Sequence, residues 1–131
     1  MKQTLIDTLK TEFGYPVRLQ GSMAKDEQYP DSFFTVWNGS TFDGSHYDNG
    51  PIRWIWDFTI YFYSTDPTLV NTIPETAIAL LKSTGWIIDG LGYDVPSDEL
   101  THTGRAFDAL FMEEVASRAA AESATESNQE D

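Results

Sequence analysis

One stretch, Ile52 to Ser64, most constrains how this chain folds. It reads IRWIWDFTIYFYS, and large apolar residues occupy all six even positions from 52 to 62. A period of two places alternate side chains on opposite faces of a β-strand, so one face of this strand is apolar. Aromatic and β-branched residues fill most of the other positions and favour the same structure. The stretch therefore predicts a long central strand with one buried face.

The elements around this strand are shorter. Apolar residues within 5–13 fall at helical spacing and Gly14 follows them, which predicts a first helix. Strand-like runs occupy residues 17–20, 33–38, 86–88 and 103–112. Helices and strands do not alternate as they do in parallel α/β proteins. The sequence therefore predicts an α+β fold in which a mostly antiparallel sheet carries two helices on one face.

The second helix contains a proline. Thr72 and Glu75 have the spacing of a capping box, and Pro74 lies between them. A proline in the first turn of a helix breaks no hydrogen bond. We therefore expect a turn over residues 67–71, and a main helix over Ile73 to Ser83 with Thr72 as its N-cap.

Gly39 to Pro51 contains three glycines and no periodicity, so we expect a long loop there, and long loops between strands often carry function. The loop over Asp26 to Asp31 is a second candidate for contacts. Large aromatic residues on the polar face of the strands exceed what a core needs. The candidate contact residues in these loops and strands are Tyr29, Trp37, Phe42, Asp43, His46, Tyr47, Asp48, Tyr61 and Tyr63.

The composition limits the possible partners. The 131 residues carry a formal net charge of −13 and include no cysteine, so disulfides, thiolate metal sites and a cysteine nucleophile are excluded. Such a chain is repelled by nucleic acid phosphates and by anionic membranes. No stretch has the length of a signal peptide core or a membrane span, and we expect a soluble protein made inside the cell. We expect one domain over 1–113, followed by an acidic, disordered tail over 114–131.

No motif for catalysis, a cofactor or a metal stands out. Phosphate-binding glycine loops and a nucleophile elbow are absent, and the weak calcium-like pattern from Asp43 ends at Trp54 where glutamate is required. The remaining enzymatic signal is a pair of strand carboxylates, Asp57 and Asp108. An exposed charge pairing with Arg53 is the more common use of such an aspartate. We therefore predict no catalytic residues, no cofactor and no metal.

The layout resembles the tail terminator, or tail-completion, proteins of long-tailed bacteriophages. The similar segments are Phe33 to Asn38, Arg53 to Pro67, Ile73 to Trp86 and Arg105 to Met112, within residues 3–113. The pattern Arg53-x-x-x-Asp57-Phe58-x-Ile60-Tyr61-x-Tyr63 is similar to the family's long strand, and Asp66-Pro67 to its helix start. Pro74 and the acidic tail depart from the family's layout.

The resemblance implies a structural virion protein rather than an enzyme. Proteins of this family form a ring, usually a hexamer, that caps the tail tube, stops its elongation and provides the joint to the head-completion or connector protein. DNA passes through such a ring without specific binding, and no membrane is involved. The protein would be made in the bacterial host cytoplasm and reside in the neck region of the virion tail.

Three alternatives remain at the level of sequence. One is a head-completion, stopper or other neck protein of the same particle. Another, of a different class, is an acidic DNA-mimic inhibitor of a DNA-processing enzyme. The third is an enzyme that uses Asp57 and Asp108.

Overall fold

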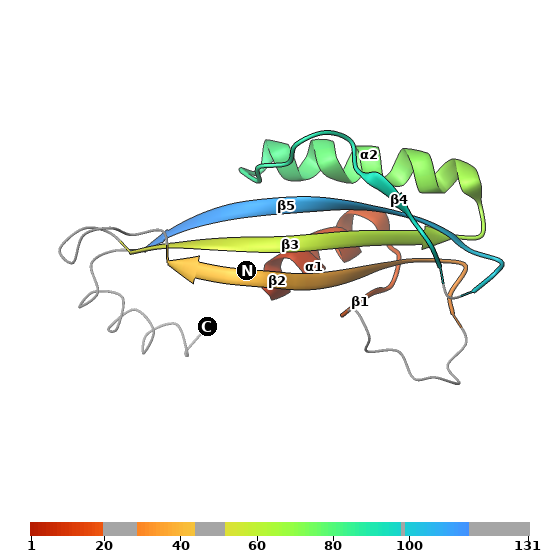
Figure 1. The fold of residues 1–131 in the computed structure, drawn as a ribbon, viewed down its shortest axis with the longest axis horizontal. Coiled ribbons are helices and arrows are strands. Elements are labelled where there is room, and N and C mark those ends of the chain that lie inside the picture. Colours follow the sequence, from red (N-terminus) through yellow and green to blue (C-terminus); the bar gives the residue numbers. More distant parts are fainter. Residues whose placement is uncertain (20–28, 44–51, 98, 116–131) are drawn as a thin grey trace.

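The computed structural model describes residues 1–19, 29–43, 52–97 and 99–115. Five strands form one sheet in the order β1-β2-β3-β5-β4, in which β1 and β2 are parallel and all other neighbours are antiparallel. Figure 1 shows the long strands side by side. The elements are α1 (Lys2–Phe13), β1 (Val17–Leu19), β2 (Ser32–Asp43), β3 (Ile52–Ser64), α2 (Pro67–Ser83), β4 (Tyr93–Val95) and β5 (Thr103–Val115).

The core lies on one face of this sheet, between the strands and both helices. The predicted alternation of β3 is confirmed in its second half, where Phe58, Ile60 and Phe62 are fully buried, whereas Trp54 is 36% exposed. The helices contribute Leu5, Ile6 and Leu9 from α1 and Ala77, Ile78 and Leu81 from α2 to the same hydrophobic cluster. In Figure 1, α1 lies behind the strands and α2 runs along the β5 side of the sheet. The α+β class with both helices on one face is therefore confirmed.

The second helix begins earlier than the sequence predicts. Asp66 is its N-cap and accepts a hydrogen bond of 2.9 Å from the backbone N–H of Thr68. Thr72 instead lies inside the helix and donates its hydroxyl hydrogen bond to the carbonyl of Thr68, so the predicted capping box is wrong. The early turn is stabilised by burial, because Val70 is 5% exposed against the core. Pro74 removes one backbone donor without ending the helix.

The predicted loop from Gly39 to Pro51 is also wrong in its first part, because β2 continues to Asp43. The pairing shifts by one residue between Asn38 and Ser40, which leaves Gly39 as the extra residue of a β-bulge. After this shift, β2 pairs with β3 again from Ser40, opposite Asp57, to Asp43, opposite Trp54. Residues 44–51 lie outside the described part of the chain.

The last part of the sheet differs in detail from the prediction. The run 86–88 forms a single bridge, from Ile87 to Leu110, and a separate short strand, β4, occupies Tyr93–Val95. β5 extends to Val115, two residues beyond the predicted domain boundary, while 116–131 lie outside the described residues. None of the described helices combines the length and the apolar character that crossing a membrane requires.

Candidate interaction surface

The sheet face opposite the helices is the candidate site, and we call it the open face. No described helix packs on it, since the core cluster gathers both helices on the other side. The pairing registers place its side chains in rows that run across the strands. In order along the sheet, the rows are Phe33/Tyr63/Gly104/Val95, Arg18/Thr35/Tyr61/Ala106/Tyr93, Trp37/Thr59/Asp108, Ser40/Asp57/Leu110/Ile87, Ile55/Met112 and Arg53/Glu114.

Aromatic rings occupy one end of the open face. Phe33 and Tyr63 stack with their centroids 5.3 Å apart, and Tyr61 stacks on Tyr63 at 6.2 Å with nearly parallel planes. Tyr29 makes an edge contact with Phe33 at 5.5 Å. His102 closes this end of the sheet, because its Nε2 donates a 2.8 Å hydrogen bond to the carbonyl of Pro30. The rings pack against one another at this end of the face, where Phe33 is buried.

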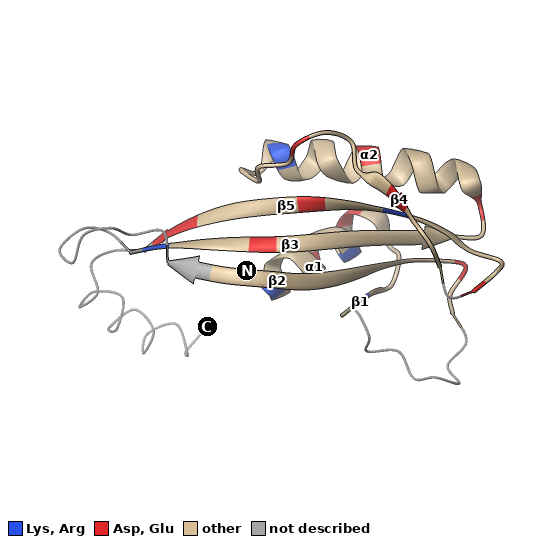
Figure 2. Ribbon diagram, in the orientation of Figure 1, with Lys and Arg blue, Asp and Glu red and all other residues tan. Residues whose placement is uncertain are grey.

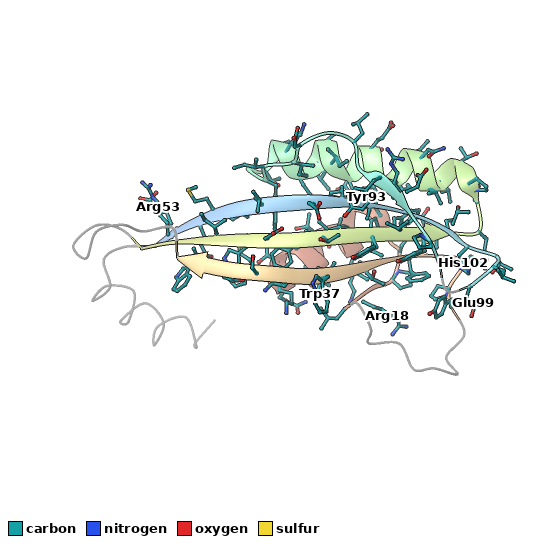
Figure 3. All side chains as sticks on the ribbon, in the orientation of Figure 1. Arg18, Trp37, Arg53, Tyr93, Glu99 and His102 are labelled. Atoms are coloured by element: carbon teal, nitrogen blue, oxygen red, sulfur yellow. The ribbon has the colours of Figure 1, made fainter. Side chains whose placement is uncertain are left out.

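Large apolar side chains are concentrated on the same face. Nine of the described large apolar residues are exposed, and five of these belong to the open face, so the concentration exceeds the usual scatter of single surface residues. Figure 3 shows Trp37 on β2 and Tyr93 on β4, on either side of the middle strands. The five residues are Trp37, Ile87, Tyr93, Leu110 and Met112.

Two carboxylates lie in the middle of this apolar surface. Asp108 accepts a 2.7 Å hydrogen bond from the hydroxyl of Thr59, its cross-strand partner. Asp57 lies in the next row, diagonally across from Asp108 on the neighbouring strand, a placement that corresponds to about 7–8 Å between Cα atoms. Figure 2 shows acidic positions on β3 and β5. The two candidate residues of the enzymatic alternative therefore share one face and lie close together.

The surroundings on the open face also change the titration of one of its own residues, Tyr93. The hydroxyl of Tyr93 lies 3.5 Å from both carboxylate oxygens of Asp108. Partial burial, and then the negative charge of Asp108, raise the pKa of Tyr93 above its ordinary value of 10.0. The phenol therefore keeps its proton, and donates its hydrogen bond to Asp108, to a higher pH than an ordinary tyrosine does.

Cations lie at the margins of this face. Arg53 forms an ion pair with Glu114 at 3.6 Å, and not with Asp57 as the sequence suggested. Arg105 points toward the helix side, where it contacts Asp94 at 3.0 Å. Arg18 lies on β1 at the edge of the sheet, opposite Thr35. Among the described residues, neither Asp57 nor Asp108 takes part in an ion pair.

The sequence-predicted contact residues divide into two groups. Trp37, Tyr61 and Tyr63 lie on the open face, and Tyr29 lies beside its aromatic end. Phe42 and Asp43 belong to β2, where their backbones pair with Ile55 and Trp54. The other three predicted residues, His46, Tyr47 and Asp48, lie outside the described residues.

Sequence reasoning missed the apolar contribution of β5 and of the two short segments beside it. Leu110 and Met112 alternate with the buried residues of β5, a signal that was readable within the predicted strand. Tyr93 and Ile87 could not be placed in this way, because their short segments have no period of their own. Across residues 1–19, 29–43, 52–97 and 99–115, no group of three or more metal-ligating side chains gathers at one place.

The open face offers another molecule exposed aromatic and aliphatic side chains and the carboxylates of Asp57 and Asp108. A comparison with protein-family models finds no match, and a search of curated proteins finds no match either.

Proposed function

We propose that this chain is a tail terminator of a long-tailed bacteriophage. In this role, copies of the chain form a ring that caps the tail tube, stops its elongation and provides the joint to the head connector. The observation that carries the proposal is the layout: a 13-residue aromatic strand at the centre of a sheet that has both helices on one face. This layout agrees with the one that the resemblance in sequence implies.

Unpaired strand edges support self-assembly. β1 pairs with β2 only over residues 34–36, and β4 pairs with β5 only over 104–106, apart from the bridge at Leu110. Toward the C-terminal ends of β2 and β5, the outer edges of these two strands have no strand partner among the described residues. Such edges present backbone donors and acceptors that a neighbouring copy can satisfy.

The charge of the chain suits a ring through which DNA moves. The formal net charge is −13, so an acidic inner wall repels the phosphates and keeps the duplex from adhering. In this proposal the protein resides in the neck region of the virion, and it needs neither a cofactor nor catalytic residues.

The test combines solution mass with binding to tail tubes. Size exclusion with light scattering, over a wide range of concentration, is expected to reveal a species near six times 14.7 kDa, alone or on addition of purified tail tubes. Electron microscopy should then locate the added density at tube ends. A chain that remains monomeric with tubes present, or that binds the portal side of heads and not tube ends, contradicts the proposal. The second result identifies a stopper protein.

A further inference from the structure

The open face has the composition of a docking surface, and its chemistry restricts the kind of partner that could cover it. One side of the sheet is closed by two helices, while the other exposes Trp37, Tyr93 and Met112 at 46–53% of their surface. When a partner covers a face of this kind, its apolar surface is removed from contact with water, and this removal favours binding.

The position of the acids restricts which partner can cover this face. Asp57 and Asp108 lie in its two middle rows, so a partner that covers the apolar residues also covers the carboxylates. A buried carboxylate without a counter-charge is costly. Among the described residues, the arginines Arg53 and Arg105 do not supply that counter-charge, because Arg53 is paired with Glu114 and Arg105 with Asp94. The partner must therefore bring positive charge.

The surrounding rings make arginine the best-suited cation. Trp37 lies in the same row as Asp108, and Tyr61 and Tyr93 lie in the adjacent row. A guanidinium group stacks on aromatic faces and binds a carboxylate through two parallel hydrogen bonds, whereas an ammonium group offers a single point of charge. We propose that the open face binds a protein surface that presents arginine side chains, with their guanidinium groups over Asp57 and Asp108 and against Trp37.

A second copy of the chain is a poorer occupant of this face. Two open faces packed against each other would bring two copies of Asp57 and Asp108 into one apolar layer. Arg18 lies at the edge of the sheet, in the row of Thr35 and Tyr61 and outside the two rows that hold Asp57 and Asp108. Like charges in a poorly hydrated layer repel each other strongly.

The test uses the full chain and a defined probe. The probe is a short acetylated and amidated peptide of alternating arginine and serine, titrated into the isotope-labelled chain and followed by NMR. We expect the largest shifts at the Trp37 indole and at the backbone amides of Asp57 and Asp108. A lysine version of the peptide is expected to bind about threefold more weakly, and a glutamate version is not expected to bind.

Charge-matched variants separate this site from general attraction to an acidic chain. The double variant Asp57→Asn/Asp108→Asn is expected to weaken binding of the arginine peptide about tenfold. The control Glu12→Gln/Glu75→Gln removes the same charge from exposed positions on the helices, and is expected to change binding less than about twofold.

A second pair of variants tests the rings. Trp37→Ala is expected to weaken binding about fivefold, while Leu19→Ala, which removes an exposed apolar side chain from the row of Val36 on the other face, leaves it unchanged. Circular dichroism and the melting temperature verify that each variant is folded.

Three results would overturn the proposal. They are equal weakening by the two double variants, NMR shifts that map to the helices, and self-association that Asp57→Asn/Asp108→Asn strengthens. The last result would assign the face to a second copy. The proposal does not rest on the ring, because the peptide titration is interpretable on a monomer, and failure to cap tubes leaves it intact.

Discussion

The ring of Tyr63 lies directly against Gly104, its partner on the neighbouring strand. A β-carbon built on Gly104 would lie 2.7 Å from Cδ1 and Cε1 of that ring, and 2.9 Å from Cγ2 of Val95. A β-carbon does not approach a ring so closely. The absence of a side chain at Gly104 therefore leaves room for the Tyr63 ring to lie over β5. The same ring stacks on Phe33. One residue without a side chain therefore shapes the aromatic end of the open face.

Replacing this glycine is expected to destabilise the fold. Gly104→Ala should lower the free energy of unfolding by about 1–3 kcal/mol, because either the ring or the strand has to move. Gly39→Ala is the matched control, since its β-carbon would have no neighbour closer than 3.8 Å, and it should change stability by less than about 0.5 kcal/mol. Urea unfolding of both variants measures the difference. Equal values would show that the Tyr63 contact does not constrain position 104.

The start of α2 gives a second prediction. Asp66→Ala should lower the free energy of unfolding by about 1 kcal/mol, because the backbone N–H of Thr68 loses its acceptor. Asp66→Asn retains an acceptor oxygen and should restore most of the loss. Thr72→Ala should stay within about 0.5 kcal/mol of the parent, since Thr72 lies inside the helix. A larger loss of stability for Thr72→Ala than for Asp66→Ala would show that the helix begins at Thr72, as predicted from sequence.

The two faces of the sheet should respond differently to truncation. Ile60→Ala removes a fully buried side chain and should lower the free energy of unfolding by about 2–5 kcal/mol. Trp37→Ala removes a larger side chain that is 53% exposed, and the loss should stay below about 1 kcal/mol. Thermal or urea unfolding compares them. A larger loss for Trp37→Ala would mean that the open face is part of a core.

The ionisation of Tyr93 gives a prediction that depends on pH. Its pKa is raised above 10.0, so the folded state retains this proton at a pH where the unfolded chain has released it. The contribution to stability is present below pH 10 and is lost as the pH rises through the raised pKa. The ultraviolet difference titration between the parent chain and Tyr93→Phe isolates this phenol.

Asp108→Asn separates the two causes of that shift. Removing the carboxylate should lower the pKa of Tyr93 only in part, because partial burial is the larger cause and remains in the variant. A return of the pKa to its ordinary value would assign the whole shift to Asp108, and no change would remove the carboxylate as a cause.

Local pattern predicted the elements better than it predicted their ends. The even residues of β3 share a face in any strand, so the burial of Phe58, Ile60 and Phe62 followed from sequence alone, whereas Trp54 on the same face is 36% exposed. The bulge at Gly39 was not predictable in this way, because it depends on hydrogen bonds between two strands. At the start of α2, Thr72 and Glu75 have the local spacing of a helix start, but the helix begins earlier, at Pro67, because this places Val70 in a buried position.

The candidate site shows the same division. The sequence identified Trp37, Tyr61 and Tyr63 as surplus to a core, and they lie together on the open face. It also singled out Asp57 and Asp108, but it paired Asp57 with Arg53, whose partner is Glu114. Cross-strand neighbours depend on register, and register is a property of two segments distant in the chain.

The sequence by itself determined which side chains share a face of each long strand, because a period of two is a local property of an extended backbone. It also determined the acidic charge and the absence of thiol chemistry. Only the tertiary structure decided the order of the strands, the length of β2, and the rows that bring Asp57, Asp108 and Trp37 together. These features follow from hydrogen bonds and packing between distant segments, which no local pattern encodes.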